Sequence, residues 1–164
     1  MEMKQQNLDM VQSYLKNGET IILAPSNPNI DAAIVGSVME LQPENLMMMS
    51  LIAKGMVEDD IQEDMKVFNA LLETETDRQL YGYIEDMSSD KSIMSGGYGA
   101  EMLQLFAEAC EERKVKYLMI YAAPSSLSNE PISAEELEEW LTTQGFDVLI
   151  PRNEVIATLM IRKL

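Results

Sequence analysis

The order of elements after residue 79 constrains the architecture of this chain most. The segment QLYGYIEDM (79–87) is predicted to be a strand. The stretch that follows it, SIMSGGYGAEMLQLFAEACEERKVKYLMIYAAP (92–124), predicts a glycine-rich turn, an amphipathic helix from Gly99 to about Arg113 and a second strand, KYLMIYAA (116–123). This alternation predicts an α/β fold in which a central mixed sheet is flanked by helices.

The last thirty residues predict a helix and a closing hairpin. Ser133 can accept a hydrogen bond from the amide of Glu136, and the Glu136 carboxylate can reach back to Ser133, which is the capping-box pattern of a helix start. The segments FDVLI (146–150) and VIATLMIRKL (155–164) then predict an antiparallel pair joined by the short turn 151–154. The helix is predicted to bury Leu137, Trp140 and Leu141.

The first 79 residues predict an opening helix, a strand, an ambiguous apolar segment and two further helices. We expect a helix over residues 5–15 and a buried strand, TIILA, over residues 20–24. The segment DAAIVGSVMEL (31–41) fits a strand or a helix, and we favour a strand. Two helices are predicted next, ENLMMMSLIAKGM (44–56) and EDDIQEDMKVFNALLETE (58–75).

Length and composition fit one soluble domain. A chain of 164 residues buries roughly 70% of the surface that it exposes when unfolded, so it needs no disulfide or metal to fold. Aromatic residues make up only 6%, so the core must be aliphatic and rich in the 14 methionines. Cys110, the single cysteine, excludes an intrachain disulfide, and we see neither a leader nor an apolar run of membrane length. A cytoplasmic protein is expected.

The absence of histidine and the negative net charge exclude or disfavour several classes of function. The chain has no histidine, which excludes a histidine catalytic dyad, a histidine metal site and a histidine pH switch. A net charge of −16 disfavours nucleic acid and anionic membranes as partners and favours a cationic partner or substrate. The acidic run EDDIQED (58–64) could chelate a hard cation, but a solvated helix start is the better interpretation, and no metal site is predicted.

The methionine run at Met47, Met48 and Met49 is better interpreted as core filling than as a docking surface.

The glycine-rich turn permits an anion site. Backbone amides converge where a glycine turn opens a helix, and the helix dipole adds positive potential at that point. Gly96, Gly97 and Gly99 would let a phosphate approach without a clash with Cβ atoms. Taken alone, these glycines are better read as a plain loop before a core helix. A dinucleotide-binding unit is disfavoured because Met102 stands where its third glycine belongs.

Together with the segments downstream, the turn resembles the GCN5-related N-acetyltransferase (GNAT) superfamily. Residues 94–99 are similar to the turn (Gln/Arg)-x-x-Gly-x-(Gly/Ala) of that family, and EELEEWLTTQGFDVLI (135–150) is similar to its helix and Gly-Phe hairpin. The resemblance covers residues 80–164, about half of the chain. It implies one GNAT-like domain over residues 1–164, with 1–79 as the variable, acceptor-side half and 80–164 as the CoA-binding half.

The resemblance also implies a reaction, in which an acetyl group moves from acetyl-CoA to a primary amine. The acidic composition favours a cationic acceptor, such as a polyamine, an aminoglycoside-like compound or a lysine-rich protein. The pantetheine arm would pass between the strand ending near Asp86 and the strand 116–122, where the two splay apart. Backbone amides of the turn would hold the pyrophosphate, and the residues concerned are Met94, Ser95, Gly96, Gly97, Tyr98, Gly99 and Ala100.

Two positions depart from the family pattern. Met94 replaces the Gln or Arg that opens the turn, and Leu141 replaces the tyrosine that protonates the departing thiolate. Tyr121 is our candidate for a replacement proton donor, and Glu85 is our candidate base for an ammonium substrate. Each also has a structural interpretation, Tyr121 as a packed strand residue and Glu85 as a solvated strand end. Further donor candidates are Tyr98, Ser125, Ser126 and Cys110, of which Cys110 is better read as a small core residue.

A different class of function stays open beside the enzyme. On the same fold, the two departures would reflect lost catalysis, and the charge of −16 would serve binding to a basic protein surface, in the manner of a nucleic-acid mimic. The sequence leaves the acceptor unspecified. It leaves the oligomeric state open as well, a homodimer included.

Overall fold

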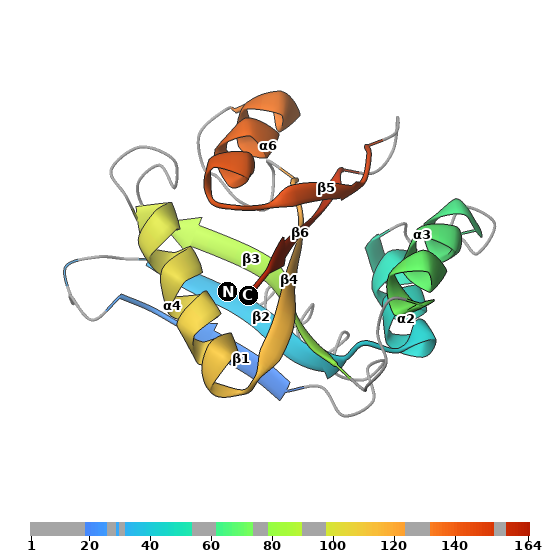
Figure 1. Cartoon of the computed structure of the whole chain (residues 1–164). Helices are drawn as coiled ribbons and strands as arrows, with labels where there is room; N and C mark the ends of the chain where they lie inside the picture. The colour runs from blue at the N-terminus through green and yellow to red at the C-terminus, as the bar shows by residue number, and fades with distance from the viewer. Residues whose placement is uncertain are drawn as a thin grey trace.

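A computed structural model gives the fold of the chain (Figure 1). It describes residues 19–25, 29, 32–53, 62–73, 79–89, 98–123, 132–152 and 157–164. The predicted first helix, residues 5–15, lies outside this part of the chain. The strands are β1 (Glu19–Leu23), β2 (Ala32–Glu40), β3 (Leu80–Ser89), β4 (Val115–Tyr121), β5 (Asp147–Ile150) and β6 (Leu159–Lys163). The helices are α2 (Pro43–Ala53), α3 (Gln62–Glu73), α4 (Tyr98–Glu112) and α6 (Ala134–Thr143).

The six strands form one mixed sheet in the order β1-β2-β3-β4-β6-β5. All neighbouring pairs are antiparallel except β3 and β4, which are parallel and are connected through α4. The mixed sheet is confirmed, and the ambiguous segment 31–41 forms strand β2, as favoured. The predicted antiparallel pair at the end of the chain is also confirmed, with β6 inserted between β4 and β5.

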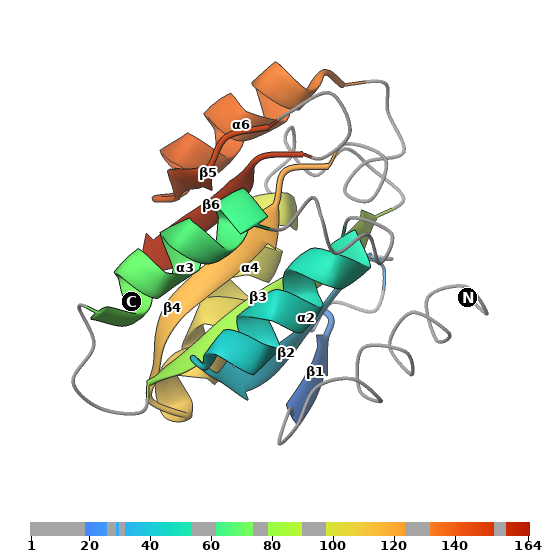
Figure 2. The ribbon, with the colours of Figure 1, turned by 90° about the vertical axis from the view of Figure 1, so that its right-hand side faces the viewer.

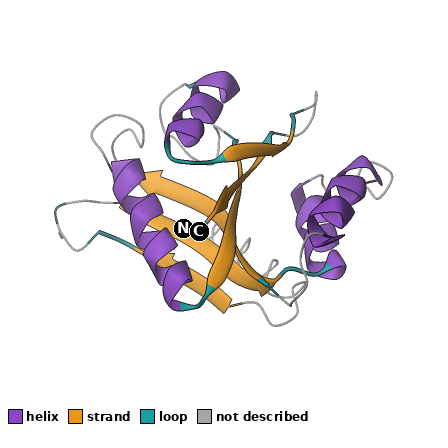
Figure 3. Cartoon of the chain, viewed as in Figure 1, coloured by secondary structure: helices purple, strands orange, loops and turns teal. Residues whose placement is uncertain are grey.

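Helices cover both faces of the sheet. Figures 1 and 2 show α4 on one face and α2 and α3 on the other, and Figure 3 shows the same layers by type of element. The buried side chains divide accordingly into two clusters. The α4-face core includes Ile34, Ile84, Leu103, Phe106, Leu118, Leu141 and Phe146. The α2/α3-face core includes Met39, Leu46, Met49, Phe68, Tyr81, Met119 and Leu159.

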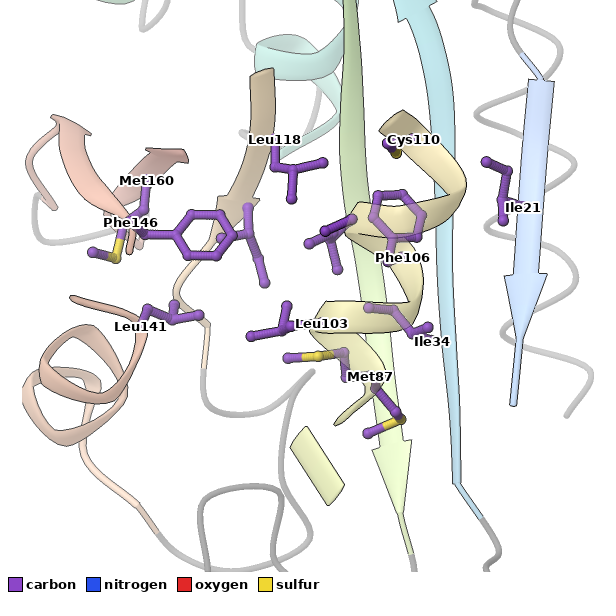
Figure 4. Close-up of a cluster of buried hydrophobic side chains, with 14 of the residues drawn as sticks. Ile21, Ile34, Met87, Leu103, Phe106, Cys110, Leu118, Leu141, Phe146 and Met160 are labelled. Carbon is purple, nitrogen blue, oxygen red and sulfur yellow. The ribbon is translucent and has the colours of Figure 1, made fainter. Parts of the chain in front are cut away.

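Helix α4 forms the centre of the α4-face core because its apolar residues recur at helical spacing. Phe106 and Cys110 point from the helix toward the strands, where Ile34 and Leu118 meet them (Figure 4). Phe106 is fully buried. The apolar side of the helix is buried, and it consists of Met102, Leu103, Phe106, Ala107 and Cys110.

Two glycines let α4 lie close to the sheet. A Cβ on Gly36 would come within 2.5 Å of both Phe106 Cζ and the backbone oxygen of Tyr83. A Cβ on Gly82 would come within 2.8 Å of Cys110 Sγ, which is a movable side-chain atom. We therefore expect Gly36→Ala to destabilise the fold by about 1–3 kcal/mol and Gly82→Ala to cost less. Chemical denaturation of the two variants measures the difference, and equal costs would contradict this account of the packing.

The structure corrects two details of the sequence interpretation. The acidic run 58–64 is not wholly a solvated helix start, because Asp64 is only 4% exposed. The closing turn is longer than the predicted 151–154, because β5 ends at Ile150 and β6 begins at Leu159. The predicted cap of the last helix is present in one direction, since the Glu136 amide donates to Ser133 Oγ at 3.1 Å. Among the described residues, no helix is long and apolar enough to cross a membrane.

Candidate functional site

Strands β3 and β4 part at their carboxyl ends. Their parallel ladder ends at the pair Ile84 and Ile120. Beyond this pair, β3 continues to Ser89 in a ladder with β2 alone, while Tyr121 of β4 pairs with Leu159 of β6. Figure 1 shows β3 ending beside the first turn of α4 and β4 running on toward α6 and β5. The facing backbone edges of the two strands are therefore not paired with each other past this point.

A β-bulge lies at the same place. Ile84 pairs with Gly36 and Asp86 pairs with Val35, so Glu85 is an extra residue in β3. Ile84 and Met87, three residues apart, both belong to the α4-face core. The side chains of Glu85 and Asp86, which lie between them, therefore both point away from that core, because the bulge interrupts the regular alternation of side chains. The sequence indicated Glu85 but not the bulge, whose one visible signal is the three-residue spacing of these apolar side chains.

The environment of Glu85 favours its protonated form. Burial and, to a smaller extent, the neighbouring Asp86 raise the pKa of its carboxyl to about 7. Its Oε2 atom is buried and accepts no hydrogen bond from the described residues. A carboxyl with such a pKa exists in both forms near neutral pH and can exchange a proton with an amine. The structure thus differs from the alternative interpretation of Glu85 as a solvated strand end.

Tyr121, the last residue of β4, packs in the α2/α3-face core. Its hydroxyl is buried and makes no hydrogen bond of acceptable geometry with the described residues. Burial and the nearby Asp64 raise the pKa of this hydroxyl. The Tyr121 ring meets that of Tyr83 edge to face, with 6.2 Å between the centroids. Tyr121 therefore stays protonated at neutral pH.

Tyr83 connects the two candidate catalytic residues. Burial raises the pKa of its hydroxyl well above the usual value, and the nearby Tyr121 and Glu85 raise it further. Tyr83 and Tyr121 both pack in the α2/α3-face core, and Glu85 points away from the α4-face core, so Glu85 and Tyr121 lie on the same side of the sheet near its parting strands. The carboxyl and the hydroxyl that the sequence indicated separately thus belong to one region.

The other donor candidates lie elsewhere. Cys110 is in the α4-face core, where burial raises the pKa of its thiol to about 12, so it is a structural residue. Leu141, which replaces the family tyrosine, is fully buried in the same core. Ser125 and Ser126 lie outside the described residues. Within the described part, no cluster of three or more acidic or cysteine side chains could hold a metal ion.

The start of α4 lies at the same end of the sheet. Tyr98, Gly99 and Ala100 form its first turn, so the helix begins one residue earlier than predicted. The backbone amides of a first turn have no partner within the helix and can bind an anion. Glu101 is also in this turn and is exposed. The remaining residues of the predicted turn, Met94, Ser95, Gly96 and Gly97, lie outside the described part of the chain.

A buried polar pair on the other face escaped the sequence interpretation. Ser50 Oγ donates to Asp64 Oδ2 at 2.7 Å, which joins α2 to α3. Ser50 is fully buried and Asp64 nearly so. No periodicity signals this pair, because Asp64 sits in a strongly acidic stretch and Ser50 in a methionine-rich one.

Comparisons with known proteins give the fold a name. Neither a protein-family model nor a curated protein matches the sequence. Among solved structures, the chain matches a crystal structure of an agmatine N-acetyltransferase with a TM-score of 0.50 and 10% sequence identity. The match covers 81% of this chain and 69% of that chain. The chain therefore has a divergent form of the GNAT fold, as the sequence resemblance implied.

Proposed function

We propose that this protein is an acyl-CoA-dependent N-acetyltransferase that moves an acetyl group from acetyl-CoA to a cationic primary amine. One observation carries the proposal. The carboxyl of Glu85, with a pKa of about 7, and the buried hydroxyl of Tyr121 face the same side of the sheet where β3 and β4 part. An acid–base group and a hydrogen-bond donor are what transfer from a thioester to an amine requires.

Glu85 acts as the base in this scheme. The acceptor enters as an ammonium ion, and the Glu85 carboxylate takes one of its protons, which frees the nitrogen lone pair for attack on the thioester carbonyl. A C–N bond forms and the C–S bond breaks. The nitrogen then loses a second proton, which neutralises the departing thiolate, so the products are an amide and a free thiol. The proton on Glu85 passes to solvent and restores the carboxylate.

Tyr121 acts as a hydrogen-bond donor to the sulfur. Its raised pKa makes full proton transfer to a thiolate less favourable than for an ordinary tyrosine, because a thiol has a pKa near 8.5. The same rise keeps the hydroxyl protonated at neutral pH, so it can always donate to negative charge that develops on sulfur. This role differs from the proton transfer predicted from the sequence.

The described residues fit an acyl-CoA in two ways. Past Ile84 and Ile120, strands β3 and β4 are not paired with each other, and their facing edges offer backbone groups to the two amides of an extended pantetheine arm, as a sheet edge does to a peptide. The first turn of α4, at Gly99 and Ala100, offers backbone amide donors to a phosphate at the same end of the sheet. When bound, acetyl-CoA supplies the activated acetyl group.

The acidic side chains favour a cationic acceptor. Glu85 and Asp86 stand together at the bulge, and their mutual repulsion is relieved by a positive charge beside them. The net charge of −16 attracts such a molecule over a longer range. Polyamines, aminoglycoside-like compounds and lysine-rich proteins share this chemistry.

A thiol-release assay tests the proposed function. The protein is mixed with acetyl-CoA and a panel of amines that differ in charge, and free thiol and acetylated product are measured. We expect turnover with cationic primary amines and none with their quaternary ammonium analogues. Tyr121→Phe should reduce kcat by about 10²-fold. Tyr117→Phe, which changes a tyrosine on the same strand and face, should leave kcat nearly unchanged. The absence of acetylated product with every amine would refute the proposal.

The acidic residue at the start of α4 gives a separate prediction about CoA binding. Glu101 lies in the first turn, where its charge opposes a phosphate on the helix amides. Glu101→Gln should therefore tighten CoA binding by about 2- to 5-fold, as calorimetry measures. Glu108→Gln, also exposed but two turns further on, should have no effect. Equal affinities for Glu101→Gln and the wild type would place the phosphates away from this helix start.

A further inference from the structure

Three polar groups meet inside the apolar layer between the sheet and helices α2 and α3. Ser50 comes from α2, Asp64 from α3 and Tyr121 from β4. Their surroundings are side chains such as Met49, Phe68 and Met119. Polar groups in such a layer contribute little to stability, because apolar residues of similar shape would pack there at no loss. Packing therefore gives no reason for this trio.

The hydrogen bond within the trio leaves one acceptor free. Ser50 uses its only proton in the bond to Asp64, so its oxygen keeps lone pairs that can accept a second bond. The hydroxyl of Tyr121 is buried without a bond of acceptable geometry and lies within interaction range of Ser50. Asp64 behind Ser50 fixes the direction of those lone pairs and adds a negative charge that opposes ionisation of the tyrosine.

We propose that Ser50 and Asp64 form a positioning pair that holds the Tyr121 hydroxyl in place for acetyl transfer. The inference rests on the proposed function for its chemical consequence, but the pair itself is a physical arrangement that can be tested without turnover. Neither residue touches the reacting atoms in this scheme. Both act through Tyr121, because Ser50 Oγ offers the phenolic proton an acceptor in one fixed direction until a stronger acceptor, the developing thiolate, arrives.

Carbon-13 labelling of the tyrosines tests the pair directly. The Cζ resonance of Tyr121 is assigned as the signal that disappears in Tyr121→Phe, and its shift reports hydrogen bonding at the phenol oxygen. We expect Ser50→Ala and Asp64→Asn to move this resonance at neutral pH. Ser50→Thr should restore it because the hydroxyl is retained. Glu63→Gln changes the exposed acid next to Asp64 and should leave the resonance in place. A Tyr121 Cζ chemical shift that is the same in Ser50→Ala, Asp64→Asn and the wild type would overturn the inference.

A double-mutant cycle then tests the catalytic consequence. Asp64→Asn should lower kcat by about 10-fold in the wild-type background, with KM for acetyl-CoA unchanged, and by less than about 2-fold in the Tyr121→Phe background. Equal losses in both backgrounds would mean that Asp64 does not act through Tyr121. If the wild type transfers no acetyl group, the proposed function fails, while the tyrosine resonance still decides whether the pair holds Tyr121. Ser50→Ala serves in place of Asp64→Asn where the latter lowers the melting temperature.

Discussion

Replacing Glu85 with glutamine is expected to reduce kcat/KM for acetyl transfer by about 10²- to 10⁴-fold, the usual contribution of a positioned base. Glutamine keeps the size of the side chain and removes its ability to accept a proton. The matched control is Glu139→Gln, which changes an exposed glutamate on α6 and should be without effect. The thiol-release assay measures both rates. Full activity in Glu85→Gln would show that the amine loses its proton to another group.

The dependence of kcat/KM on pH tests the same role of Glu85. Only the carboxylate form of Glu85 accepts a proton, so kcat/KM should rise with pH and level off above the carboxyl pKa of about 7. This rise should be absent in Glu85→Gln. Asp86→Asn removes the neighbouring charge that helps to raise the pKa of Glu85, so the rise should move to lower pH.

Stability should change in the opposite sense. The folded state raises the pKa of Glu85 from its ordinary value of 4.5 to about 7, so folding disfavours the charged carboxylate. This cost is absent below pH 4.5 and complete above about pH 7, so wild-type stability falls across that window. Glu85→Gln should therefore be more stable than the wild type at pH 8, by about 1 kcal/mol once partial solvent access is allowed for. A variant that is less active and more stable would identify Glu85 as a functional rather than a structural residue.

Phe106→Ala is expected to have the largest effect on folding. The ring is fully buried and is the group that a Cβ on Gly36 would strike, so its removal leaves a cavity between α4 and β2 that neither element can readily close. We expect a loss of about 3–5 kcal/mol in the free energy of unfolding. For a chain of this length, that loss lowers the melting temperature by about 6–20 °C.

Calorimetry or circular dichroism measures the change, and Gln104→Ala on the exposed side of the same helix is its control. Gln104 is exposed and, among the described residues, donates to Glu108 one turn along, so its replacement should cost less than about 0.5 kcal/mol. Similar losses in the two variants would show that burial at Phe106 does not dominate the packing of α4.

The sequence predicts the β3, α4 and β4 unit well because its signals are local. A helix such as α4 shows its buried face through spacing, and a buried strand such as β4 shows it through a short apolar run. Local signals are not sufficient for segment 31–41, because an apolar run of that length fits either a strand or a helix until its neighbours are known. The antiparallel pairing of β2 with both β1 and β3 decides in favour of a strand.

The candidate site is less predictable because its properties arise from tertiary contacts. Glu85 and Tyr121 could be named from the sequence, but their raised pKa values come first from burial in the folded protein, and for Tyr121 also from Asp64, which lies far away in the chain. Asp64 shows the limit most clearly. The four other acidic residues of the run 58–64 suggest a solvated segment, whereas the Asp64 side chain turns inward and accepts a hydrogen bond from Ser50 on another helix.

The bulge in β3 decides how many acidic side chains stand where β3 and β4 part. Because Glu85 is one residue more than β2 can pair with, deleting it would close the ladder without shortening the sheet. Asp86 would then follow Ile84 directly, and Met87 would fall on the same face as Ile84 by simple alternation. One carboxylate would remain where two now stand. The pair of acidic side chains at the parting strands therefore depends on the one extra residue of the bulge. A homologue without this residue would keep the same sheet and carry one carboxylate there in place of two.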